Sequence, residues 1–82
     1  MLIMFLDDSK EEVWIKSEAL QRITFSERYK RITFKVNDGS YLAYFPSEVK
    51  FTSAYFCLFN AVVYRHESVN LVQFQCDEEA SS

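Results

Sequence analysis

The side chains that could carry out chemistry are few in this 82-residue chain, and they are poorly spaced. There is one histidine, His66, and there are two cysteines, Cys57 and Cys76. A structural zinc site needs about four Cys or His ligands, and the chain has neither the CxxC nor the HExxH spacing. We therefore expect no metal site.

A nucleophilic triad of Cys57, His66 and an acid is the one catalytic arrangement that these residues could form. A reactive thiolate needs a polar, partly exposed setting. Cys57 instead lies in the apolar run "AYFCLFNAVVY", where cysteine typically behaves as a small buried hydrophobe. We expect His66 to be a surface residue and Cys76 to be a free thiol.

The remaining polar residues also form no catalytic pattern. The acidic pairs Asp7-Asp8 and Glu11-Glu12 occur in a segment typical of a solvated turn. A single glycine excludes a glycine-rich loop for phosphate groups. We expect a non-enzymatic protein with no catalytic residues and no cofactor.

The charges are distributed unevenly along the chain. The net charge is −3, with acids near both ends, yet residues 22 to 35 carry one acid, Glu27, against five bases: Arg22, Arg28, Lys30, Arg31 and Lys35. One interpretation is a solvated sheet face whose charges discourage edge pairing. The other is a docking face, which would also include Tyr44, for an acidic protein surface or nucleic acid.

The elements that must position these residues are mostly strands in the first 45 residues. Leu2 to Leu6 is a fully apolar run, and alternation follows in "VWIK" and in the two copies of "RITF". We expect the two copies to pair in a hairpin with Ile23 opposite Ile32. A tighter turn would set Arg22 against Lys35, which is a like-charge pair.

A second hairpin is predicted at Asp38-Gly39, the commonest signal for a type I′ turn. It sets Val36 beside Tyr41 and Phe34 beside Ala43. The shared inner face is then consistent across the three strands. Arg22, Arg31, Lys35 and Tyr44 lie on the other face.

A helix is predicted after Pro46, with Ser47, or alternatively Thr52 or Ser53, as its N-cap. Its buried stripe is predicted to consist of Tyr55, Leu58, Phe59 and Val62. The β-branched segment "AVVYRH" could instead form a strand. Residues 70 to 75 are predicted to form a final strand. These patterns favour an α+β fold, in which a small, mostly antiparallel meander of about five strands carries one helix. A small all-β barrel is the alternative.

We expect one domain over residues 1–76 and an acidic flexible tail over residues 77–82. The chain has no signal-peptide pattern and no apolar run long enough to span a bilayer. The cysteine usage is typical of a reducing compartment. A soluble, cytoplasmic protein without membrane contact is the expectation.

The helix is hydrophobic nearly all round, so one stripe on a small sheet cannot bury it completely. Phe56, Val63 and Tyr64 are left over, and large exposed apolar patches usually mark interfaces. We expect these residues to contact a second copy in a homodimer, or another partner. Alternatively, the final strand and the "RHESVN" segment could cover them.

The segments "EVWIKSEALQRITF" and "KRITFKVNDGSYLAYF" resemble the β-meander of LytTR-type DNA-binding domains, and equally the start of the flagellar FlbD family. "HESVNL" is similar to the LytTR "HRSxxVN" segment, near the region that contacts DNA in that family. The family's final hairpin and basic net charge are missing here. The resemblance implies an antiparallel meander and DNA binding as fold-level analogies.

Together these patterns favour a small non-catalytic interaction protein that binds a macromolecular partner, most simply a protein. Bacterial and phage-type inhibitors and regulators are of this size and composition. The alternative is a nucleic-acid-binding module that uses the basic hairpin.

Overall fold

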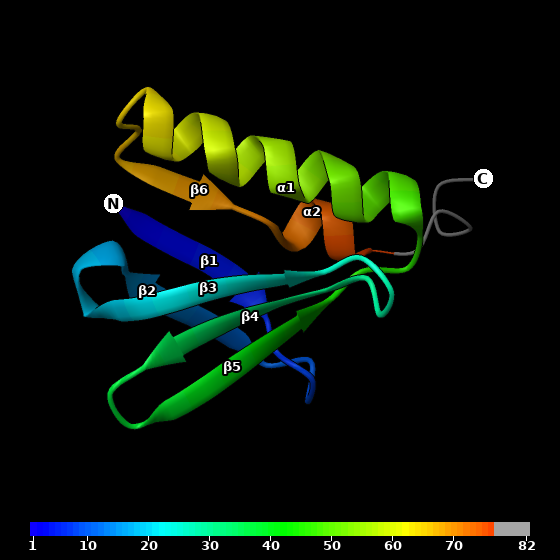
Figure 1. The fold of residues 1–82 in the computed structure, drawn as a ribbon, viewed down its shortest axis with the longest axis horizontal. Coiled ribbons are helices and arrows are strands. Elements are labelled where there is room, and N and C mark those ends of the chain that lie inside the picture. The colour runs from blue at the N-terminus through cyan, green and yellow to red at the C-terminus, as the bar shows by residue number, and fades with distance from the viewer. Residues whose placement is uncertain (77–82) are drawn as a thin grey trace.

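The computed structural model describes residues 1–76, so the predicted acidic tail lies outside the described residues. Within these residues, six strands form two three-stranded sheets, and a long helix lies along one side of them (Figure 1). The elements are β1 Leu2–Leu6, β2 Glu12–Lys16, a 3-10 turn Ser17–Ala19, β3 Leu20–Ser26, β4 Arg31–Val36, β5 Gly39–Tyr44, α1 Glu48–Val63, β6 Ser68–Asn70 and α2 Val72–Gln75. The predicted α+β class is confirmed, and the strands do not close into a barrel.

The first sheet has the order β2-β1-β6, with β1 at its centre. Ile3 and Phe5 of β1 are completely buried, as expected for a central apolar strand. β2 runs antiparallel to β1, whereas β6 runs parallel to it and pairs Leu2 with Ser68. The turn between β1 and β2 is fixed by Asp7, whose carboxylate accepts hydrogen bonds from the backbone N–H groups of Ser9 and Glu11.

The predicted strand over residues 70 to 75 is wrong, because the chain turns after Asn70 and continues as the short helix α2. The Asn70 side chain accepts a hydrogen bond from the Val72 N–H (2.9 Å), which favours a turn over a strand. Gln75 then bonds both backbone groups of Leu6: it accepts from the N–H (2.9 Å) and donates to the carbonyl (2.7 Å). The Gln75 side chain thus makes the hydrogen bonds with the backbone at the end of β1 that a neighbouring strand was expected to make.

The second sheet has the order β3-β4-β5, and its first hairpin has the register that the like-charge argument disfavoured. Arg22 lies opposite Lys35, and Phe25 lies opposite Ile32. The pair is tolerated because both side chains are exposed, and water screens their repulsion. The turn over residues 27–30 closes with a 3.3 Å hydrogen bond from the Lys30 N–H to the Glu27 carbonyl, and Lys30 has a φ of 53°.

The second hairpin turns at Asn37 and Asp38, one residue earlier than predicted, and pairs Phe34 with Tyr41. Gly39 therefore begins β5 and has a φ of 149°. Among the non-glycine residues of the described chain, only Lys10, Lys30 and Arg65 have a positive φ, so Asp38 lacks the conformation that type I′ requires. In both hairpins the predicted register is wrong by two residues. A shift by two residues keeps each side chain on the same face of the sheet, so the predicted faces of the strands are correct.

The core lies between the two sheets and α1. Phe5 of the first sheet stacks on Phe34 of the second, with the ring centroids 4.5 Å apart. The helix begins as predicted, because the Ser47 hydroxyl accepts a hydrogen bond from the Lys50 N–H (3.2 Å). It continues to Val63, so the first part of "AVVYRH" is helical.

The buried stripe of α1 differs from the predicted one. The helix buries Phe51, Ala54, Leu58 and Ala61, whereas Phe59 and Val62 are more than half exposed and Tyr55 is half-buried. The two alanines allow the helix to pack closely on the core. The larger side chains at Phe59 and Val62 are consequently turned outward. No helix within residues 1–76 is long and apolar enough to cross a membrane.

Candidate functional site

One side of α1 presents an uncovered apolar surface, which we call the apolar face. It consists of Val49, Thr52, Phe56, Phe59, Val62 and Val63, all of which are exposed. Val49, Phe56 and Val63 are seven residues apart, so they share one line along the helix. No charged residue occurs between Lys50 and Arg65. The surface is therefore uncharged over more than three helical turns, and most of its exposed side chains are apolar.

The residues predicted to remain uncovered are all exposed. Phe56 and Val63 lie on the apolar face, whereas Tyr64 follows the end of the helix and its ring lies beside His66, with centroids 6.5 Å apart. β6 and α2 contact α1 but leave these residues open to solvent. The alternative, in which the "RHESVN" segment and a final strand cover them, is wrong.

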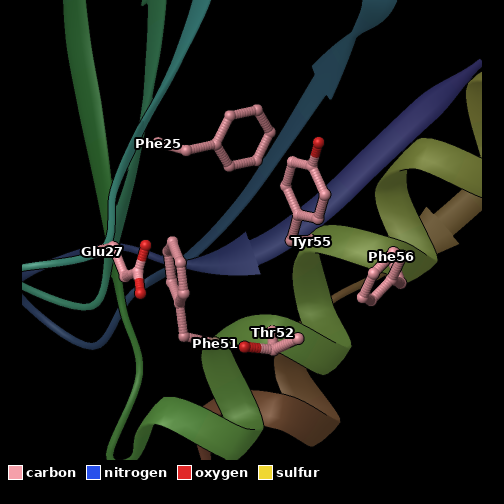
Figure 2. Close-up of a pocket in the computed structure, with 6 residues that line it drawn as sticks. All are labelled: Phe25, Glu27, Phe51, Thr52, Tyr55 and Phe56. Carbon is pink, nitrogen blue, oxygen red and sulfur yellow. The ribbon is translucent and has the colours of Figure 1, made fainter.

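A groove of about 300 Å³ borders the apolar face where α1 passes the end of β3. Figure 2 shows its lining residues, which come from both elements and from the turn after β3: Phe25, Glu27, Phe51, Thr52, Tyr55 and Phe56. Phe25 meets Tyr55 edge to face at 4.7 Å, and Tyr55 in turn contacts Phe56 at 5.4 Å. Four aromatic rings therefore form most of its wall.

One charged group, the Glu27 carboxylate, lies at this groove. Within residues 1–76, no hydrogen bond or ion pair to this carboxylate is present. Sequence reasoning placed Glu27 in a turn and Phe25 on a covered face, so it missed the groove. The excess of aromatic residues in α1 was a signal for an open surface, but nothing in the sequence shows where the helix crosses β3.

The predicted basic residues separate into two groups. Arg31 and Tyr44 are direct cross-strand neighbours on the outer face of the second sheet, and the turn that carries Arg28 and Lys30 is next to them. Arg22 and Lys35 pair with each other four residues farther along β4, roughly 13 Å away at 3.3 Å per residue. The outer-face assignment is correct, but the six residues do not form one compact cluster.

Tyr29, which sequence reasoning did not select, organises the group at the turn. The guanidinium carbons of Arg28 and Arg31 lie 5.4 Å and 5.0 Å from the centroid of its ring. Such distances allow cation–π attraction. The Nε atom of Arg31 is buried and has no hydrogen-bond partner in the described chain. The turn thus presents two stacked cations around one exposed aromatic ring.

The nucleophilic and metal-ligating residues do not gather. Cys57 is half-buried, and this burial raises the pKa of its thiol, which disfavours the reactive thiolate. Cys76 and His66 are exposed, and no hydrogen bond joins Cys57 to His66. Over residues 1–76, no three His, Cys, Asp or Glu residues lie close enough together to hold a metal ion.

Comparisons with protein-family models, curated proteins and solved structures find no significant match to this chain. The resemblance to LytTR-type and FlbD-like proteins therefore stays a prediction.

Proposed function

We propose that this chain is a small non-catalytic interaction protein, of the kind used by bacteria or phages as inhibitors and regulators, and that it binds a protein partner through the apolar face of α1. The supporting observation is the exposure of Val49, Phe56, Phe59, Val62 and Val63, each more than half accessible, on one uncharged helix surface. Monomeric proteins rarely leave a contiguous apolar patch of this kind in water.

The physical reason for partner binding is the hydrophobic effect. Full burial of a Val or Phe side chain contributes about 1.5–3 kcal/mol, so five half-exposed ones contribute roughly 4–8 kcal/mol from this side of an interface. Association costs about 4–15 kcal/mol in lost translational and rotational freedom. A stable complex therefore needs the partner's own apolar surface and contacts beyond this helix.

The proposal is tested by charge substitution on the apolar face. Phe59→Glu places a carboxylate in the centre of the face and should remove the partner that co-purifies with the wild-type protein from its native host. Lys35→Glu, on the outer face of the second sheet, is the matched control and should retain it. Circular dichroism checks that both variants are folded. Equal recovery of the partner by wild type and Phe59→Glu would exclude this face.

The partner could be a second copy of the chain, because the same face on two copies is self-complementary about a two-fold axis. A homodimer and a complex with another protein use the same residues. Light scattering separates the two cases.

A nucleic-acid-binding module is the second candidate, supported by the cluster of Arg28, Tyr29 and Arg31. Cations beside an exposed aromatic ring are a common way to hold single-stranded nucleic acid. Binding should then fall log-linearly with salt concentration. Tyr29→Ala should weaken it, whereas Trp14→Ala, which removes an exposed ring from β2, should not. If the protein does not bind oligonucleotides even at low salt, this candidate is rejected.

A further inference from the structure

The groove beside α1 has the composition of a cation-binding site. Its wall contains the rings of Phe25, Phe51, Tyr55 and Phe56, and Glu27 supplies its one charged group. In Figure 2 the rings of Phe25 and Tyr55 lie together on one side, while the Glu27 carboxylate is beside the ring of Phe51. An aromatic ring carries negative charge density on its face and attracts a cation within about 6 Å of its centre.

The carboxylate of Glu27 is available to a ligand. The basic residue next to it in the chain, Arg28, has its guanidinium over Tyr29 instead, and no ion pair joins Arg28 to Glu27. Arg31 is also held at Tyr29. Both guanidinium groups therefore lie at Tyr29, and within residues 1–76 neither forms an ion pair with Glu27.

The size of the groove limits its occupant. About 300 Å³ is at the lower end of the range for small-molecule sites, roughly 300–1,000 Å³. It suits one long side chain better than a cofactor. A lysine or arginine side chain combines an apolar stem, which would pack on the rings, with a charged end that would reach Glu27.

A second carboxylate lines a neighbouring hollow that shares Thr52 with the groove. Glu48 lies one helical turn before Thr52, and these two residues line an adjoining hollow with Val49 and Ser53. The net charge of −3 also favours the approach of a basic partner at long range. The net charge of the protein and the local charge of the groove thus both favour a positively charged occupant.

We propose that this groove binds a lysine or arginine side chain from a basic segment of the protein partner. The inference rests on the proposed function, because the groove adjoins the apolar face through Phe56 and would supply the additional contact that this face needs. The charged end would lie at Glu27, and the stem would pack on the exposed surface of the rings that line the groove, where Phe25 and Tyr55 already touch each other.

The test uses the isolated protein and two small probes that differ by one charge. N-acetyl-lysine methylamide and its neutral counterpart, N-acetyl-norleucine methylamide, are titrated while NMR follows the ring signals of Phe25 and Tyr55. The lysine probe should shift both rings, and the norleucine probe should bind about tenfold more weakly. Equal affinity of the two probes would overturn the proposal, and so would an absence of shifts at the highest soluble concentration.

A pair of variants connects the binding to Glu27. Glu27→Gln should weaken the lysine probe about tenfold, and it removes a charge from an exposed residue, so the fold should be unaffected. Glu67→Gln removes the same charge beyond the other end of α1 and should bind the probe normally. Unchanged binding by Glu27→Gln would contradict the assignment.

This experiment is independent of the partner. If Phe59→Glu leaves the natural complex intact while the lysine probe still shifts both rings, the proposed use of the apolar face fails and the groove remains a cation site. If Phe59→Glu prevents formation of the natural complex but the lysine probe does not bind, the inference about the groove is wrong and the proposed use of the apolar face is still supported.

Discussion

At Gly39 the backbone has a φ of 149°, a conformation that residues with a side chain rarely adopt. Apart from Gly39 itself and its two chain neighbours, no residue has a heavy atom within 4 Å of the position that a Cβ would occupy. Gly39→Val should therefore destabilise the protein through backbone strain and not through a steric clash, by roughly 1–3 kcal/mol. Urea unfolding measures this change.

Ser40→Val provides the control for that prediction. Ser40 is the next residue of β5 and is exposed, so a β-branched residue there should change the free energy of unfolding by less than about 0.5 kcal/mol. Equal stability of Gly39→Val and Ser40→Val would show that the hairpin does not have this backbone conformation.

The two cysteines should react at different rates. Burial raises the pKa of the Cys57 thiol, so its thiolate fraction at a given pH is below that of an exposed cysteine. Cys76 is exposed. A disulfide reagent at neutral pH should modify Cys76 first, and the Cys76→Ser variant should react slowly until the pH is raised or the protein is unfolded. Fast modification of that variant under native conditions would place Cys57 at the surface.

Among the elements, α1 shows most clearly what the sequence could and could not predict. Its start at Ser47 and its helical period followed from local chemistry, because capping and spacing act within a few residues. The rotation of the helix did not follow. Large apolar residues occur all round it, and the choice of Ala54 and Ala61 for the core depends on how closely the sheets approach.

Strand registers illustrate the same limit. Alternation of apolar and polar residues determined which face each strand buries, and those assignments are correct. The pairing partners were wrong by two residues in both hairpins, since the faces are equally satisfied by either register. The conformations of Lys30 and Gly39 distinguish the registers, and residue type alone did not reveal them.

The candidate surfaces were predictable to different degrees. The exposure of Phe56 and Val63 followed from the excess of apolar residues in one helix. The groove did not, because it needs Phe25 of β3 to meet Tyr55 of α1. Contacts between elements distant in sequence leave no periodic pattern.

A pair of substitutions tests the rotation of α1. Ala54 is fully buried, so Ala54→Leu overpacks the core and should cost about 1–3 kcal/mol. Phe59 is more than half exposed, so Phe59→Ala should cost far less than the roughly 3–5 kcal/mol typical of a buried phenylalanine. Thermal unfolding of the two variants gives the order. If Phe59→Ala instead lowered the stability more than Ala54→Leu, the stripe predicted from the sequence, in which Phe59 is buried, would be correct.

The molecule has two different surfaces, one on α1 and one on the outer face of the second sheet. Figure 1 shows α1 along one side and the β4–β5 hairpin on the other. The exposed surface of α1 is apolar and borders the aromatic groove, whereas the outer face of the second sheet carries Arg22, Arg31 and Lys35. One molecule could therefore engage an apolar partner through α1 without covering its basic face.

The oligomeric state follows from the same surface. If the partner of the apolar face is a second copy, light scattering of the wild type should give a dimer at high concentration, and Phe56→Glu should give a folded monomer. Phe56 is exposed, so this substitution should leave the fold intact. A wild type that is monomeric at every concentration assigns the face to a different protein, whereas an unfolded variant would place Phe56 in the core.

Site-specific photo-crosslinking in the native host is the most direct test of whether the apolar face of α1 is an interface. A photoreactive phenylalanine analogue replaces Phe59 on the apolar face in one variant and Ser40 on the exposed outer face of β5 in the other. Position 59 should give a discrete adduct of defined mass, formed with a second copy or with a partner, and position 40 should give none. The same adduct from both positions, or no adduct from position 59, would contradict the assignment of the apolar face of α1 as the interface.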